Sequence, residues 1–314
     1  MKIIFFGSPA YSIPIIDQIK TLDYDLLGVV TQNDQKIRRR KILKTAVYSY
    51  AEKKGFKIFS PSESLNDDFI NEIRKLNPDL IIIFAYGKIL PNKLISIPKH
   101  GCLNIHASIL PKWRGAAPIQ RALLSGEKKT GITFFKINEE LDKGNIVSTH
   151  EIQISDKDDS LTLQIKLSKL AVENLKGAIE SIVNGSGFLK QDESESSYAK
   201  KISKKESIID WNDAAVNIIS KVRAFVGWPV AEGLILGTQI RIWSALLSDG
   251  STSKTPGEVV SFDKNGLKIS TGKGIINIQK LQFAGKNVVT ARDLFNSNDS
   301  FSKLIRKTSG QQNR

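Results

Sequence analysis

The five consecutive apolar residues at 80–84 (LIIIF) restrict the fold more than any other feature. A strand that is apolar on both faces must be covered on both faces, which is typical of a parallel sheet between helices. Apolar runs at 2–6 and 26–30 fit the same interpretation, and residues 11–22 and 68–76 have helical spacing. Alternation of such strands and helices predicts an α/β domain.

The elements that follow complete this domain. A short strand is predicted at 102–106, paired strands at 132–137 and 146–154, and a long amphipathic helix at 160–183. The helix at 11–22 should begin irregularly because Pro14 lies within it. The first strand leads into GSPA rather than G-x-G-x-x-G, and the chain has no GxxxxGK[ST] motif. The alternation of strands and helices predicts a Rossmann-like parallel sheet. Because both nucleotide-binding motifs are missing, a P-loop NTPase or a dehydrogenase is disfavoured.

The second part of the chain differs in pattern. Residues 190–206 are polar and carry charge runs, which indicates a linker. A helix is predicted at 214–225, and short strand-like runs follow at 234–243, 257–262, 267–270 and 275–281. Such runs, separated by glycine turns, predict a small OB-like β-barrel. We therefore expect domains at 1–189 and 207–314, joined by a linker at 190–206.

Charge and composition limit the cellular setting and the partners. Of the formal charge of +14, residues 198–314 carry +9, with 18 Lys and Arg against 9 Asp and Glu. A basic surface of this kind suits a polyanion such as nucleic acid, although solubility is an alternative explanation. No apolar stretch approaches the roughly 20 residues that span a bilayer, and a single cysteine fits a reducing compartment. We expect a cytoplasmic protein that does not bind a membrane.

Asn104 and His106 are the strongest candidates for chemistry. They are two apart on a predicted strand, so their side chains share a face, at the strand end where open α/β sheets bind ligands. A carboxamide can donate to an oxyanion and an imidazole can move a proton, a combination suited to acyl transfer. Asp142, in the turn between two predicted strands, could orient the imidazole. The alternative is a histidine that merely satisfies local polar groups.

Other reactive residues are weaker candidates. Cys102 precedes Asn104 by two residues and could be a nucleophile, but a lone buried cysteine more often acts as a small hydrophobe. His100 and His150 lack partners at ligand spacing, so we expect no metal site. The basic segment at 33–44 includes Arg38, Arg39, Arg40 and Lys41. It is predicted as a surface loop that could grip phosphates, or as a solvated charge run.

The run NIHASILPKWRGAAPIQRA, which begins at Asn104, closely resembles the signature of the methionyl-tRNA formyltransferases, within the folate-dependent formyltransferase family. The resemblance extends to AYGKILP at 85–91, LDKG at 141–144 and VRAFVGWP at 222–229, and so covers both predicted domains. Two positions depart from the family pattern. Ala107 stands where glycine is usual, and the loop at 33–44 lacks the usual Pro and Gly.

The resemblance implies roles for particular residues. It places the catalytic trio on Asn104, His106 and Asp142, and tRNA contacts on the basic loop Arg38, Arg39, Arg40 and Lys41. It places folate contacts on two segments: Ser108, Ile109, Leu110 and Pro111, and Tyr86, Gly87, Ile89 and Leu90. The implied reaction transfers the formyl group of 10-formyltetrahydrofolate, without a metal, to the α-amino group of initiator methionyl-tRNA. The first domain would be catalytic and the second would bind tRNA, in a monomer.

Two rival functions stay open at this point. A sugar-nucleotide N-formyltransferase would use the same trio on a different amine. The second rival is a non-catalytic RNA-binding protein on an inherited fold. The intact trio disfavours this alternative. The WRGAAPIQ run and the basic second domain favour tRNA as the substrate.

Overall fold

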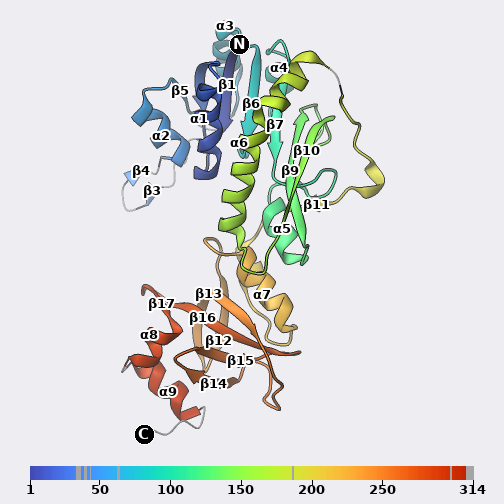
Figure 1. The fold of residues 1–314 in the computed structure, drawn as a ribbon. Coiled ribbons are helices and arrows are strands. Elements are labelled where there is room, and N and C mark those ends of the chain that lie inside the picture. The colour runs from blue at the N-terminus through green and yellow to red at the C-terminus, as the bar shows by residue number, and fades with distance from the viewer. Residues whose placement is uncertain are drawn as a thin grey trace. The chain divides into compact units, whose positions relative to one another are not determined.

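The computed structural model describes residues 1–32, 37–38, 41–42, 44–61, 64–185, 187–297 and 299–308 (Figure 1). The chain forms two compact units. The first comprises Met1–Pro118, Lys129–Ile154 and Leu163–Lys201, and the second Ile119–Lys128, Ser155–Thr162 and Ile202–Arg314. The second unit therefore includes two segments that precede the predicted linker.

The first unit is built on a mixed sheet, which within the described residues has the strand order β10-β9-β7-β6-β1-β2-β5. The parallel strands are β1 (Lys2–Gly7), β2 (Asp25–Val30), β5 (Ile58–Phe59), β6 (Leu80–Phe84) and β7 (Cys102–His106). β9 (Lys129–Lys136) pairs antiparallel to β7, and β10 (Ile146–Gln153) pairs antiparallel to β9. The predicted α/β domain is confirmed, and all five residues of β6 are buried.

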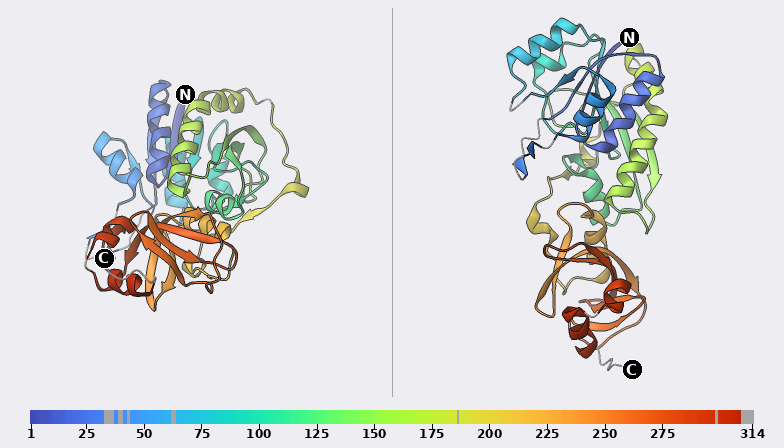
Figure 2. Two further views of the ribbon diagram at one scale, coloured as in Figure 1. Left: turned by 60° about the horizontal axis from the view of Figure 1, so that its bottom comes forward. Right: turned by 90° about the vertical axis from the view of Figure 1, so that its left-hand side faces the viewer.

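Helices cover both faces of this sheet, as the apolar strands require. On one face α3 (Asp67–Leu76) packs Ile70 and Ile73 into a core shared with Ile4 and Ile81. Figure 2 shows α1 (Ile13–Thr21) and α6 (Ser160–Asn184) side by side, away from α3. The predicted irregular start of α1 is the 3₁₀ turn Ala10–Ser12, which precedes Pro14 in the first helical turn. Two shorter helices are α2 (Ala46–Lys54) and α4 (Asn92–Ile95).

Much of the segment at 190–206 packs within the first unit. Gln191 is buried, and the segment continues through the 3₁₀ turn Glu193–Glu195. β11 (Tyr198–Ala199) then pairs in parallel with β8 (Arg114–Gly115). These residues therefore gain fixed backbone partners, although their polar composition suggested a solvated linker.

The second unit holds an antiparallel sheet, as predicted for the C-terminal part. Its strands are β12 (Ala231–Ile235), β13 (Thr238–Ser248), β14 (Val259–Asp263), β15 (Gly266–Ser270), β16 (Ile275–Phe283) and β17 (Val288–Thr290). In the described residues they follow the order β12-β13-β16-β15-β14, with β17 also on β16. The other elements are α5 (Pro118–Leu124), the 3₁₀ turn Lys204–Ser207 and α7 (Ala215–Ala224).

The details of this unit differ from the prediction in several places, and β17 is one of the elements that were not predicted. The single strand predicted at 234–243 is a hairpin, because Leu236 and Gly237 turn the chain with positive φ. Two helices were not predicted, α8 (Ala291–Asn296) and α9 (Ser300–Thr308), because they are only 6 and 9 residues long and their apolar spacing spans few turns. α8 starts at a capping box between Thr290 and Asp293. Within the described ranges, every helix is too short or too polar to span a membrane.

The buried central strand should dominate the stability of the first unit. We predict that Ile82→Ala lowers its free energy of unfolding by about 2–5 kcal/mol, because the lost side chain leaves a cavity in a fully buried strand. Ile165→Ala is the control, since Ile165 lies on α6 and is 68% exposed, and it should change stability by less than about 0.5 kcal/mol. Urea denaturation followed by circular dichroism measures both. Equal effects of the two substitutions would contradict the assignment of the core.

Candidate active site

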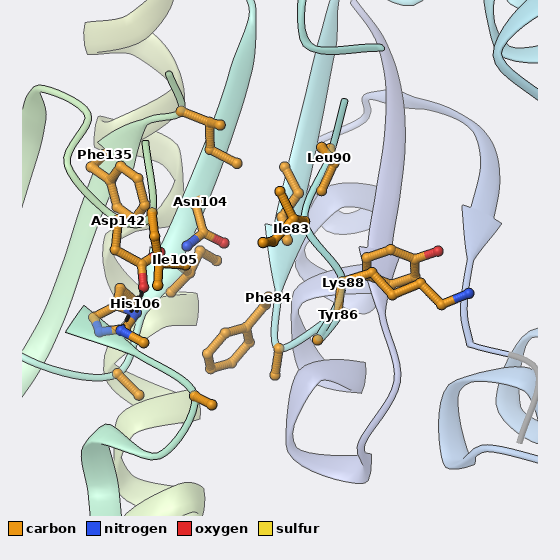
Figure 3. Close-up of a pocket in the computed structure, with 18 of the residues that line it drawn as sticks. Ile83, Phe84, Tyr86, Lys88, Leu90, Asn104, Ile105, His106, Phe135 and Asp142 are labelled. Atoms are coloured by element: carbon orange, nitrogen blue, oxygen red, sulfur yellow. Dashed lines mark hydrogen bonds and ion pairs between the residues drawn. The ribbon is translucent and has the colours of Figure 1, made fainter. Parts of the chain in front are cut away.

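A cavity of about 380 Å³ lies at the carboxyl ends of β6 and β7 (Figure 3). Most of its lining comes from residues 83–90, 104–107 and 137–142, and the rest from Tyr11, Gly115, Ala116, Pro118 and Phe135. All of these residues belong to the first unit. Polar groups meet at one side of a mainly apolar pocket, the arrangement typical of small-molecule sites.

The three residues predicted to be catalytic come together at this cavity. Asn104 and His106 lie on β7, and Asp142 lies in the connection between β9 and β10. Figure 3 shows all three on one side, across from Tyr86 and Leu90. The Asp142 Oδ2 atom is 3.7 Å from His106 Nδ1, and both side chains are largely buried. The Asn104 carboxamide has no hydrogen-bond partner among the described residues, which leaves its N–H groups available to a ligand.

One hydrogen bond determines which nitrogen of His106 can take up a proton. The Nε2 atom lies 2.8 Å from the backbone carbonyl oxygen of Trp113. A carbonyl only accepts, so Nε2 carries hydrogen and donates it. In the neutral ring Nδ1 is then unprotonated, and it is the nitrogen that faces Asp142. The pair can therefore accept a proton at Nδ1, with the carboxylate offsetting the positive charge.

Asp142 is held by contacts from distant parts of the chain. Its Oδ2 atom accepts a hydrogen bond of 2.7 Å from the backbone N–H of Gly115. Its backbone carbonyl accepts one of 2.8 Å from the side chain of Gln191. Its φ is +51°, a left-handed conformation that aspartate tolerates better than most residues. Trp113, Gly115 and Gln191 were not predicted from the sequence, because backbone contacts and long-range pairing leave no local signal.

The loop after β6 forms the opposite wall, and it contains Tyr86, Gly87, Ile89 and Leu90. Ile89 is 78% exposed, whereas Tyr86 and Leu90 are buried. Gly87 has a φ of +81°, and a Cβ there would lie 2.7 Å from the Gln32 side chain, so both conformation and space favour glycine. Burial raises the pKa of Tyr86 to about 12, and that of Tyr11 likewise to about 12. Both phenols therefore stay protonated at pH 10, where an exposed tyrosine is about half ionised.

The other predicted folate segment, residues 108–111, is absent from the lining of this cavity. Ser108 is fully buried and donates a hydrogen bond of 2.6 Å to the Lys112 carbonyl. Thr133 of β9 donates to the Ser108 carbonyl and accepts from the Leu110 N–H. This segment therefore supports the chain after β7, and direct folate contact from it stays a prediction.

The remaining single candidates lie outside the cavity. Cys102 is buried in the core, and burial raises the pKa of its thiol to about 12, so it is not a thiolate nucleophile. His150 lies on β10, where burial lowers its pKa. The described part of the chain has no cluster of His, Cys, Asp and Glu able to hold a metal.

The basic loop is described only in part. Arg38 and Lys41 lie on the short strands β3 (Ile37–Arg38) and β4 (Lys41–Ile42), which pair antiparallel. Their side chains, and the whole of Arg39 and Arg40, lie outside the described residues. The tRNA contacts predicted for these four residues stay a prediction.

Comparison with known proteins identifies the family of this chain. Residues 1–179 match the formyl transferase family, and residues 201–299 match the formyl transferase C-terminal domain. Among solved structures, the sugar 3N-formyl transferase WlaRD has a TM-score of 0.66 at 22% identity, covering 91% of this chain and 99% of its own. Methionyl-tRNA formyltransferase from Clostridium thermocellum has a TM-score of 0.59 at 18% identity, covering 80% and 95%.

A curated relative carries the assignment further than the fold does. The methionyl-tRNA formyltransferase of Buchnera aphidicola is 38% identical over 308 residues, which cover 97% of this chain and 98% of the relative. The similarity therefore extends over both units. This chain belongs to the methionyl-tRNA formyltransferase family.

Proposed function

We propose that this protein transfers the formyl group of 10-formyltetrahydrofolate to the α-amino group of initiator methionyl-tRNA. The observation that carries the proposal is the meeting of Asn104, His106 and Asp142 at one cavity, in a chain of this family. The direct test mixes the purified protein with 10-formyltetrahydrofolate and methionyl-tRNA and assays formylmethionyl-tRNA. We further propose that it acts as a monomer in the cytoplasm, where its tRNA substrate is used.

The reaction requires the protein to stabilise a developing negative charge and to move a proton. The amine nitrogen forms a bond to the formyl carbon, and the bond from that carbon to the folate nitrogen breaks. One proton leaves the amine and one arrives at the folate nitrogen, so the exchange needs no oxidant or reductant. Negative charge develops on the formyl oxygen during the transfer. A hydrogen-bond donor for that oxygen and a group that moves the proton are therefore sufficient.

The site residues match these two requirements. The Asn104 carboxamide offers N–H groups with no competing partner among the described residues, so it is the donor for the developing charge. His106 takes the proton at Nδ1, because Nε2 already donates to the Trp113 carbonyl. Asp142, 3.7 Å from Nδ1, stabilises the charged ring that results. The partly apolar surroundings strengthen these interactions by lowering the local dielectric.

The cavity suits the flat ring system of a folate. Its volume of about 380 Å³ lies within the range of small-molecule pockets. The apolar side chains Ile83, Leu90 and Ile105 also line it. We assign the folate to this cavity, and WlaRD, whose fold is similar, was solved in the presence of 5-N-formyl-THF.

The choice of tRNA over a sugar amine depends on features beyond the trio. The fold is compatible with both, since WlaRD is a sugar formyl transferase. The full-length similarity to a named methionyl-tRNA formyltransferase favours tRNA. The concentration of +9 charge in residues 198–314 also favours a polyanionic substrate.

The first functional prediction concerns the two residues on β7. Asn104→Ala and His106→Ala should each lower kcat by about 100-fold or more, because each removes a group needed mainly in the transition state. KM should change much less. Asn71→Ala on α3 and His100→Ala are matched controls outside the cavity and should retain activity. Normal kcat in a folded Asn104 or His106 variant would refute the assigned role.

The second concerns the charge of Asp142. Asp142→Asn keeps an oxygen that can accept from the Gly115 N–H but removes the charge beside His106. We expect kcat to fall by about 100-fold or more and the dependence of kcat on pH to change. The exposed Asp156→Asn is the control. Full activity with an unchanged pH profile would show that Asp142 only shapes the turn.

The third concerns tRNA binding by basic residues. The dissociation constant for tRNA should rise at least about tenfold between roughly 50 and 200 mM salt, because neutralised phosphates release counterions. The double variant Arg39→Gln, Arg40→Gln should bind more weakly and depend less steeply on salt. Lys169→Gln, Lys176→Gln removes the same charge from α6 and serves as the control. Salt-independent binding, or equal effects of the two double variants, would contradict the predicted contacts.

A further inference from the structure

A polar cluster around the buried side chains of Arg114 and Gln191 has no assigned role. Arg114, in β8, is fully buried, which is rare for an arginine unless it is paired. Its Nη1 and Nη2 atoms donate to Glu193 at 2.9 and 2.8 Å. Its Nε and Nη2 atoms donate to Gln191 Oε1 at 3.0 and 2.7 Å. The guanidinium is therefore held on two sides by residues far along the chain.

The other end of Gln191 reaches the turn that carries Asp142. Its Nε2 atom donates 2.8 Å hydrogen bonds to the backbone carbonyls of Asp142 and Gly144. The orientation of the amide is set by both neighbours, since Arg114 requires an acceptor and the two carbonyls require a donor. Gln191 therefore links the buried guanidinium to the backbone on both sides of Lys143.

The main chain beside Arg114 contacts the same catalytic pair. The Trp113 carbonyl accepts from His106 Nε2, and the Gly115 N–H donates to Asp142 Oδ2. Residues 113–115 thus hold the histidine and the carboxylate directly, while the Arg114 side chain holds the Asp142 turn through Gln191. Every one of these residues belongs to the first unit.

We propose that Arg114 and Gln191 are positioning residues that set the distance between His106 and Asp142. The inference rests on the proposed function of that pair. The ion pair joins a buried Arg114 to Glu193, whose side chain is 57% exposed. Such a pair adds little net stability, because desolvation of the guanidinium and screening by solvent offset the attraction, so stability alone is a weak reason for this cluster. Its contacts instead converge on the turn whose carboxylate must face the imidazole. Neither residue lines the cavity, so each acts only through Asp142 and His106.

Gln191→Glu is the sharpest test. The new side chain has the same length and still accepts from Arg114, but it places an oxygen against the Asp142 and Gly144 carbonyls. We expect kcat to fall about 10- to 100-fold, because displacing a reacting group by up to about 1 Å has an effect of this size. KM for 10-formyltetrahydrofolate should change little, because the cavity lining is intact. Gln153→Glu on β10 is exposed and controls for the added charge.

Two further variants keep the test decisive if Gln191→Glu does not fold. Gln191→Met removes the hydrogen bonds of the amide without adding charge and should also lower kcat. Glu193→Gln keeps an acceptor for Arg114 and should stay near full activity. Histidine NMR spectra add a readout that does not depend on turnover. The ring signals of His106 should shift in the Gln191 variants, while those of His100 and His150 stay in place.

The outcomes separate the inference from the proposed function. Normal kcat and unshifted His106 signals in folded Gln191 variants, with a lower melting temperature alone, would overturn the positioning role. An active His106→Ala variant would instead overturn the proposed catalytic pair. Loss of kcat in His106→Ala together with full activity in Gln191→Met would reject the positioning role and leave the pair standing.

Discussion

The hydrogen bonds that hold Asp142 connect residues far apart in the chain, and the candidate site depends on them. The Gly115 N–H lies 27 residues away and the Gln191 amide 49 residues away. Together they bring the connection between β9 and β10 to the end of β7. Burying a carboxylate beside a largely apolar cavity is unfavourable unless hydrogen bonds compensate for the lost water. These two contacts provide that compensation for the Asp142 turn. The proposed catalytic pair therefore forms only in the folded first unit.

Burial affects both the pKa values and the hydrogen bonds of the polar groups in and near the cavity. It raises the pKa values of Tyr11 and Tyr86 to about 12, so both phenols stay protonated even at pH 10. It also strengthens any hydrogen bond from Asn104 to a developing negative charge. The same low dielectric makes an unpaired Arg114 costly, which explains why Glu193 contacts it in addition to Gln191. Hydrogen bonding to Arg114 in turn lowers the pKa of Glu193.

The residues proposed for formyl transfer and most of the net positive charge lie in different parts of the chain. The lining of the cavity belongs to the first unit, whereas +9 of the net charge of +14 lies in residues 198–314. Proteins of similar fold include a sugar 3N-formyl transferase, so the fold itself does not select one amine. In the proposed function the trio acts only on the atoms that react, so the choice of amine falls to residues other than the trio.

Several features of this protein follow from local sequence alone. The buried strand β6 was predictable because five apolar residues in succession need cover on both faces. Asn104 and His106 were predictable as a pair, since a strand places alternate side chains on one face. The hairpin at Leu236 and the helices α8 and α9 were not, because their turns and short apolar patterns are ambiguous without tertiary contacts.

The arrangement around His106 and Asp142 was decided only by the tertiary structure. The sequence indicated Asp142 as a partner for His106, but not the contacts that bring it there. Trp113 and Gly115 act through backbone atoms, which every residue type possesses, so their identities carry no signal. Gln191 lay in a segment whose polar composition indicated a linker, yet it is buried by pairing with Arg114. Hydrogen bonds between distant residues depend on the completed fold, and no local pattern records them.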